Sequence, residues 1–138
     1  MELSPQRRLS GILAPLFALR GSSDLGVGDV GALRELVDWA AGRGLRVVQL
    51  LPVNETGNDH SPYNAISSVA LDPLTIELIP ERLPDLTAEV LAEERERYYT
   101  RSAAEGPVVY KIVKPLKRAI LHRSFERFIL KTGMGLHG

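Results

Sequence analysis

Side chains suited to ligand binding gather in one short stretch, from Asn54 to Asn64. Asn54 supplies an amide group, Ser61 a hydroxyl, and Tyr63 an aromatic face whose own hydroxyl stays free to form a hydrogen bond. An aromatic face of this kind can pack on the C–H groups of a sugar ring. A tyrosine that follows Ser-Pro is also a common packed anchor within a loop, so both interpretations of Tyr63 stay open at this point.

A predicted strand leads directly into this stretch. Residues 45–51 carry a largely apolar run in which Arg46 and Gln49 are the polar positions, the pattern of a parallel strand covered on both faces. Parallel strands belong to α/β folds, in which ligands collect at the carboxyl ends of the strands. Asn54, Ser61 and Tyr63 follow such an end, so the sequence predicts a ligand-binding loop there.

An amphipathic helix is predicted before this strand. Asp29 is placed to cap its first turn, and Gly42 and Gly44 can end it. Its apolar positions recur at helical spacing: Leu33, Leu36, Val37, Ala40 and Ala41. A short strand over residues 11–13 precedes the helix, so residues 10–52 are interpreted as one strand–helix–strand unit of an α/β fold. The connection from Ala14 to Gly28 is long enough to suggest a functional loop.

Two further helices are predicted in the second half of the chain. One starts after Thr87, with the charges of residues 93–97 as a solvated face and with Tyr98 and Tyr99 in contact with the core. In the other, Pro115 occupies the first turn and Gly133 marks the end. Its expected core face is Leu116, Ile120, Leu121, Phe125, Phe128 and Ile129. Lys111, Lys114, Lys117, Arg118 and Arg123 form a modest basic cluster beside it.

Composition excludes several classes of protein. The 138 residues hold 17 Lys plus Arg and 17 Asp plus Glu, so no net field favours nucleic acid or anionic lipid. No cysteine is present, no apolar span is long enough for a membrane, and a cytoplasmic setting is the default. His60, His122 and His137 lack the spacing of a metal site.

One strand–helix–strand unit cannot cover a parallel sheet, and a complete barrel takes about 250 residues, so we expect a fragment.

The sequence also contains weak signals for a dinucleotide-binding site and for a serine-hydrolase site. Gly26 to Gly31 matches the G-x-G-x-x-G pattern of dinucleotide-binding domains, and Glu55 could supply the ribose-binding acid. However, residues 20–24 form no strand before the pattern, and Asp29 would repel a pyrophosphate. His60 next to Ser61 does not make a serine hydrolase, because the strained nucleophile turn is missing.

Taken together, the chain resembles the N-terminal part of the 4-alpha-glucanotransferases, the amylomaltase family of the alpha-amylase superfamily. The resemblance rests on an ordered set of segments: 11–13, 26–31, 48–52, 56–57, 61–63 and 72–74. The chain departs from the family pattern at Val48, where many members have Trp, at Leu71, and at Val109, where Asp often precedes the tyrosine matched by Tyr110.

This resemblance implies a (β/α)8 barrel, with residues 1–80 as its first part and residues 81–138 as a helical insertion. It implies retaining transfer of alpha-1,4-glucan segments between maltooligosaccharides or starch-derived glucans, without a cofactor. The catalytic carboxylates would lie beyond Gly138, so no catalytic residue is assigned here and the fragment alone is expected to be inactive. Tyr63, Ser61 and Asn54 would bind sugar, and Gln49 would orient their loop. The alternative is a non-catalytic glucan-binding or interaction module, and the oligomeric state is left open.

Overall fold

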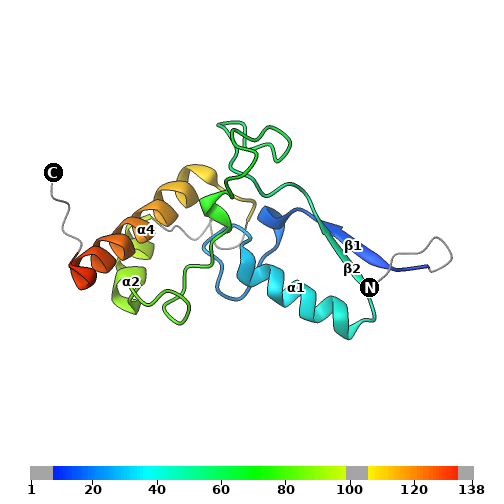
Figure 1. Ribbon diagram of the computed structural model, residues 1–138, viewed down its shortest axis with the longest axis horizontal. Helices are drawn as coiled ribbons and strands as arrows, with labels where there is room; N and C mark the ends of the chain where they lie inside the picture. The colour runs from blue at the N-terminus through cyan, green and yellow to red at the C-terminus, as the bar shows by residue number, and fades with distance from the viewer. Residues whose placement is uncertain (1–7, 99–105, 134–138) are drawn as a thin grey trace.

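The computed structural model describes residues 8–98 and 106–133 (Figure 1). This part of the chain is a mixed α/β structure with two parallel strands and three α-helices. Its elements are β1 (Gly11–Ala14), the 3-10 turn η1 (Leu16–Ala18), α1 (Val30–Gly42), β2 (Val47–Leu50), the 3-10 turn η2 (Pro73–Thr75), α2 (Ala88–Tyr98) and α4 (Tyr110–Thr132).

The predicted strand–helix–strand unit is confirmed. β1 and β2 pair in parallel, from Gly11 opposite Val47 to Ala14 opposite Leu50. The Asp29 side chain caps α1 by accepting hydrogen bonds from two backbone N–H groups of the first turn. The helix ends at Gly42, and Gly44 has φ 75°, a left-handed conformation that lets the chain turn back into β2.

The described residues do not cover both faces of the two strands, as expected for a single strand–helix–strand unit. Leu13 of β1 is 57% exposed, and Val47 of β2 is exposed as well. The helix contributes less cover than its pattern predicts, because Val37 and Ala41 are exposed whereas Ala32 and Ala40 are buried. A single helix beside two strands covers only part of one face, so apolar side chains of both the sheet and the helix stay open.

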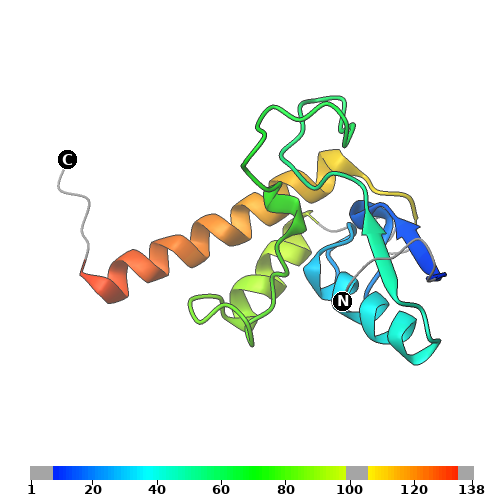
Figure 2. The ribbon, with the colours of Figure 1, turned by 45° about the vertical axis from the view of Figure 1, so that its right-hand side comes forward.

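The main core lies between α2, α4 and two loop segments. It consists of Leu25, Leu78, Leu86, Val90, Leu116 and Ile120, with Tyr98 packed against it. Since Leu25 comes from the connection before α1, this core joins the strand–helix–strand unit to the two later helices. Figure 2 shows the result: α4 runs away from the sheet, with α2 beside it. Tyr99, which was expected to share this core, lies outside the described residues.

Several details of α2 and α4 correct the sequence-based expectations. Glu94 belongs to the predicted solvated face of α2, yet it is buried and accepts a hydrogen bond from Arg123 at 3.1 Å. Pro115 is not in the first turn of α4, because the helix already begins at Tyr110. Phe125 and Phe128 are 54% and 38% exposed, since α2 covers only the side of α4 that carries Leu116 and Ile120.

α4 ends next to Gly133, as predicted from the sequence. Gly133 adopts φ 64°, the left-handed conformation that commonly terminates a helix. Within residues 8–98 and 106–133, no helix is both long enough and apolar enough to cross a membrane.

Candidate functional site

The candidate site is the connection between β2 and η2, residues 51–72, which we call the Tyr63 loop. In Figure 1 it projects upward beside the start of α4. Isolated antiparallel bridges pair Asn54 with Leu71 and Thr56 with Ala65. The backbone N–H of Asp72 also donates to the carbonyl of Val53. These hydrogen bonds close the base of the loop and hold it at the carboxyl end of β2.

Tyr63 lies in a tight turn at the far end of this loop. The backbone N–H of Asn64 donates to the carbonyl of Ser61 at 3.0 Å, and the Asn64 amide donates to Asp59 at 2.7 Å. The Tyr63 side chain is 74% exposed. It therefore does not act as a packed anchor against the described residues, and its ring is open to contact from outside.

Ser61 and Asn54 are placed differently from Tyr63. Both are half-buried. The Ser61 backbone N–H donates to Asp59 at 3.4 Å, and the Asn54 amide donates to the carbonyl of Ala70 at 3.4 Å. Asn54 thus supports the base of the loop, whereas Ser61 lies in the turn that carries Tyr63. Gln49, which was expected to orient the loop from within β2, is exposed on that strand.

A small pocket lies beneath the loop, next to the start of α4. Its polar lining comes from Asn54, Thr56, His60, Asp72, Thr75 and Tyr110. The volume is about 40 Å³, which suits a water molecule or two rather than a sugar ring. Ser61 and Tyr63 are not among the lining residues. The three predicted sugar-binding residues therefore share one loop without surrounding a common cavity in the described part of the chain.

His60 has a structural environment that the sequence did not indicate. Its ring stacks on the ring of Tyr110, with centroids 3.9 Å apart and planes 13° from parallel. Burial, together with the positive charge of Lys114, lowers the pKa of His60 and favours the neutral imidazole. In sequence His60 stands beside Ser61, but in space its partner is Tyr110 at the first position of α4.

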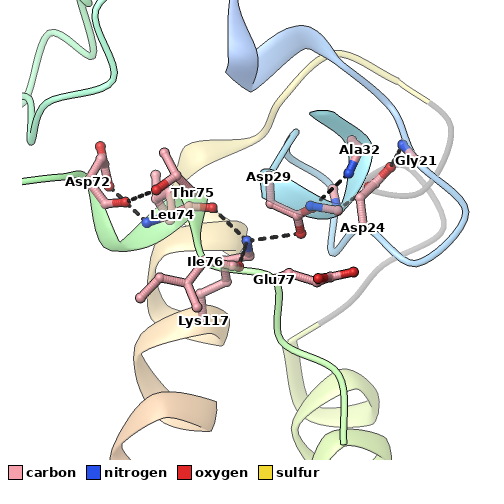
Figure 3. Close-up of polar contacts among 12 residues, drawn as sticks. Gly21, Asp24, Asp29, Ala32, Asp72, Leu74, Thr75, Ile76, Glu77 and Lys117 are labelled. Carbon is pink, nitrogen blue, oxygen red and sulfur yellow. Dashed lines mark hydrogen bonds and ion pairs between the residues drawn. The ribbon is translucent and has the colours of Figure 1, made fainter. Parts of the chain in front are cut away.

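A buried lysine fastens α4 to the segment that follows the loop (Figure 3). Lys117 Nζ donates to the carbonyls of Leu74 and Ile76 at 2.6 and 2.8 Å. It also lies 3.5 Å from Asp29, the capping residue of α1. Burial lowers the pKa of Lys117, and the nearby Asp29 charge opposes this effect.

Lys117 was grouped by sequence with a modest basic cluster beside this helix, and its burial was not anticipated. The burial of Lys117 could have been inferred from its helical spacing relative to two apolar residues. Lys117 stands four residues after Val113 and three before Ile120, both of which are fully buried. A lysine at such a position must have buried acceptors, and here backbone carbonyls supply them.

The structure also explains the glycine pattern at residues 26–31 without a dinucleotide. A Cβ on Gly28 would lie 1.9 Å from the carbonyl oxygen of Leu16, so glycine is required for close packing. The Asp29 carboxylate already accepts the N–H groups of Gly31 and Ala32 at the start of α1. These are the donors that a pyrophosphate would need, and they face a carboxylate instead. Within the described ranges, no group of three or more His, Cys, Asp and Glu side chains is arranged to hold a metal ion.

Comparison with known proteins gives the family. The sequence profile of glycoside hydrolase family 77, described as 4-alpha-glucanotransferase, matches residues 14–134. A 4-alpha-glucanotransferase of Chlamydia pneumoniae is 38% identical over 117 residues, which are 85% of this chain and 22% of the relative. That of Chlamydia caviae is 35% identical over 123 residues, or 89% of this chain and 23% of the relative. The rice protein 4-alpha-glucanotransferase DPE2 (Oryza sativa subsp. japonica) is 33% identical, over 88% of this chain and 14% of the relative.

The chain therefore spans between 14% and 23% of the length of these curated relatives. None of these three relatives supports the alternative of a non-catalytic glucan-binding or interaction module. Because the family profile covers most of the sequence, the chain belongs to the 4-alpha-glucanotransferase family, glycoside hydrolase family 77.

Proposed function

We propose that the complete protein containing this chain is a 4-alpha-glucanotransferase that transfers alpha-1,4-glucan segments between maltooligosaccharides. The match of the family profile to residues 14–134 carries this proposal. The relatives from Chlamydia and rice, all named 4-alpha-glucanotransferases, agree with it. The cysteine-free composition fits a cytoplasmic location, which we include in the proposal.

The proposed architecture is a (β/α)8 barrel, with residues 1–80 as its first part and residues 81–138 as a helical insertion. Family membership and the right order of elements, two parallel strands joined by a helix, support the barrel. Its active-site face would be the face at the carboxyl ends of the strands. The Tyr63 loop follows β2 at that end, so it would line the sugar-binding cleft.

The proposed chemistry is a retaining double displacement. One carboxylate attacks the anomeric carbon and the bond to the leaving sugar breaks, while a second carboxylic acid gives that sugar oxygen its proton. The resulting carboxylate then takes a proton from the hydroxyl of an incoming sugar, which attacks the same carbon and releases the first carboxylate. The two groups must lie about 5 to 5.5 Å apart.

Four aspartates of this chain have other partners, which supports placing the reactive carboxylates elsewhere in the polypeptide. Asp29 caps α1, and Asp72 caps η2 by accepting the N–H of Leu74. Asp24 accepts hydrogen bonds from Arg20 and from two backbone N–H groups. Asp59 accepts the amide of Asn64. Each of these carboxylates has a local structural function that explains its presence.

For this chain we propose a sugar-binding function in which Tyr63 is the stacking surface. Its exposed ring at the tip of the loop can contact the C–H face of a glucosyl unit. Ser61 would bond to a sugar hydroxyl beside it, and Asn54 would hold the base of the loop in place. The three residues would then contribute binding and orientation rather than proton transfer.

Incubation of the complete, purified gene product with maltotriose tests the proposed activity. Glucose and maltooligosaccharides longer than maltotriose should appear together, because transfer to a sugar acceptor conserves glycosidic bonds. Glucose and maltose without longer products would indicate hydrolysis. Binding of maltotriose without any conversion would instead indicate the non-catalytic module.

A further inference from the structure

The far end of the Tyr63 loop is joined to α4 by one aromatic contact. Residues 57–64 are otherwise held by hydrogen bonds among themselves, such as Asn64 N–H to Ser61 and the Asn64 amide to Asp59. His60 then stacks on Tyr110, which is 50 positions later in the sequence. Because Tyr110 is the first residue of α4 and packs beside buried Val113, it gives the loop a rigid surface to rest on.

The backbone of His60 adopts an unfavourable conformation. His60 has φ 54°, and it is the one non-glycine residue with positive φ in the described ranges. This left-handed conformation is unfavourable for a residue with a side chain. The residue that carries this strained backbone is the same residue whose ring stacks on Tyr110.

The stack of His60 on Tyr110 is a contact between rings and not a hydrogen bond. Among the described residues His60 Nδ1 has no hydrogen-bond partner, and the pocket of about 40 Å³ that His60 lines has room for a water molecule. The contact with Tyr110 therefore uses the flat shape of the imidazole.

We propose that His60 is a positioning residue for sugar binding: its stack on Tyr110 clamps the turn that carries Tyr63, and thereby fixes the Tyr63 ring for contact with a glucosyl unit. This inference rests on the proposed function of the Tyr63 loop and adds a residue to it. It also links the start of α4 to the sugar-binding loop.

The test uses variants of the complete protein that separate the ring from the backbone conformation. His60→Asn removes the ring but keeps a residue that tolerates a left-handed φ, whereas His60→Phe keeps a ring. Tyr110→Leu and Tyr110→Phe form the matching pair on α4. We expect His60→Asn and Tyr110→Leu to raise the KM for maltotriose about 2- to 10-fold, the scale of one aromatic pair. The kcat should change less, and both ring-keeping variants should resemble the wild type.

A double variant distinguishes positioning from general stability. If His60 acts through Tyr63, His60→Asn should raise the KM no further once Tyr63→Ala is present. If the two effects multiply, His60 does not act through Tyr63 and the inference is wrong. An unchanged KM for maltotriose in His60→Asn would also contradict the inference.

Hydrogen exchange tests the clamp without relying on activity. Amides of residues 57–64 should exchange faster in His60→Asn and Tyr110→Leu than in the wild type, and at the wild-type rate in the Phe variants. Equal exchange in all variants would overturn the clamp. A wild-type protein that shows no glucan transfer would refute the proposed function, and it would leave this exchange result to decide the clamp by itself.

Discussion

Lys117 and Asp29 lie 88 positions apart in the sequence, yet their side chains approach to 3.5 Å in the interior of the protein. The ammonium group of Lys117 contacts the residue that caps α1 and, through the carbonyls of Leu74 and Ile76, the segment that follows the Tyr63 loop. One side chain of α4 therefore connects the sheet-bearing unit, the end of the binding loop and the later helices (Figure 3).

Replacing Lys117 with Met should destabilise the protein by about 3 to 5 kcal/mol. The long apolar side chain of Met fills much of the same space, but it leaves the Asp29 carboxylate without its counter-charge and the carbonyls of Leu74 and Ile76 without their donor. Thermal or denaturant unfolding of the complete protein measures the loss. Arg118→Met, at the exposed neighbouring position, is the matched control and should change stability by less than about 0.5 kcal/mol. Equal effects of the two variants would contradict this interpretation of Lys117.

The parts of the fold that were predicted correctly depend on local signals. Asp29 could be recognised as a helix cap because the N–H groups it accepts lie two and three residues ahead. Gly44 and Gly133 were recognisable as helix ends because both positions require a left-handed backbone. The parallel pairing of β1 and β2 follows from the helix between them, since a parallel pair needs such a crossover.

The parts that were missed depend on distant partners or on weak local signals. α4 begins at Tyr110 although Val109 provides no side-chain cap, so the first recognisable start signal in the sequence is Pro115, inside the helix. The burial of Glu94 depends on Arg123, which is 29 positions away. The stack of His60 on Tyr110 joins residues 50 positions apart, and no periodicity relates them. Tyr63 was predicted as a site residue from its type and loop, but its exposure required the structure.

Gly28→Ala should lower the free energy of unfolding far more than Gly42→Ala. In Gly28→Ala the Cβ would meet the carbonyl oxygens of Leu16 and Leu19 at 1.9 and 2.4 Å, and backbone atoms cannot move aside cheaply. We expect a loss of at least about 2 kcal/mol in unfolding free energy. Gly42→Ala meets no atom within 4 Å at the end of α1, so it should be neutral or stabilising by up to about 1 kcal/mol. Similar melting temperatures for the two variants would argue against the close approach at Gly28.

Asp24 should contribute to stability in a pH-dependent manner. Burial alone would raise the pKa of Asp24, but hydrogen bonds from Arg20 and from the Gly26 N–H outweigh it and hold the pKa below its usual value of about 3.9. A carboxyl whose pKa is lower in the folded state stabilises the fold above its unfolded pKa. That contribution disappears as the pH falls below about 3.9 and through the folded pKa.

Melting temperatures of the wild type and Asp24→Asn, measured from pH 7 down to pH 2, check this expectation. The asparagine keeps one acceptor oxygen but cannot carry the charge. Its melting temperature should be lower than that of the wild type at pH 7, and the difference should shrink as the wild-type carboxyl becomes protonated. A difference that stays constant over the whole range would show that the Asp24 charge has no part in the stability.

Tyr63 should be required for glucan transfer because of its ring rather than its hydroxyl. Tyr63→Ala in the complete protein should reduce kcat/KM for maltotriose by roughly 1 to 3 kcal/mol in transition-state terms, the scale of a lost stacking contact. Tyr63→Phe keeps the ring and should retain most of the activity. Because the side chain is 74% exposed, neither change should lower the melting temperature by more than a few degrees. Normal kinetics in Tyr63→Ala would exclude the ring from sugar binding, and a large loss in Tyr63→Phe would shift the contact to the hydroxyl.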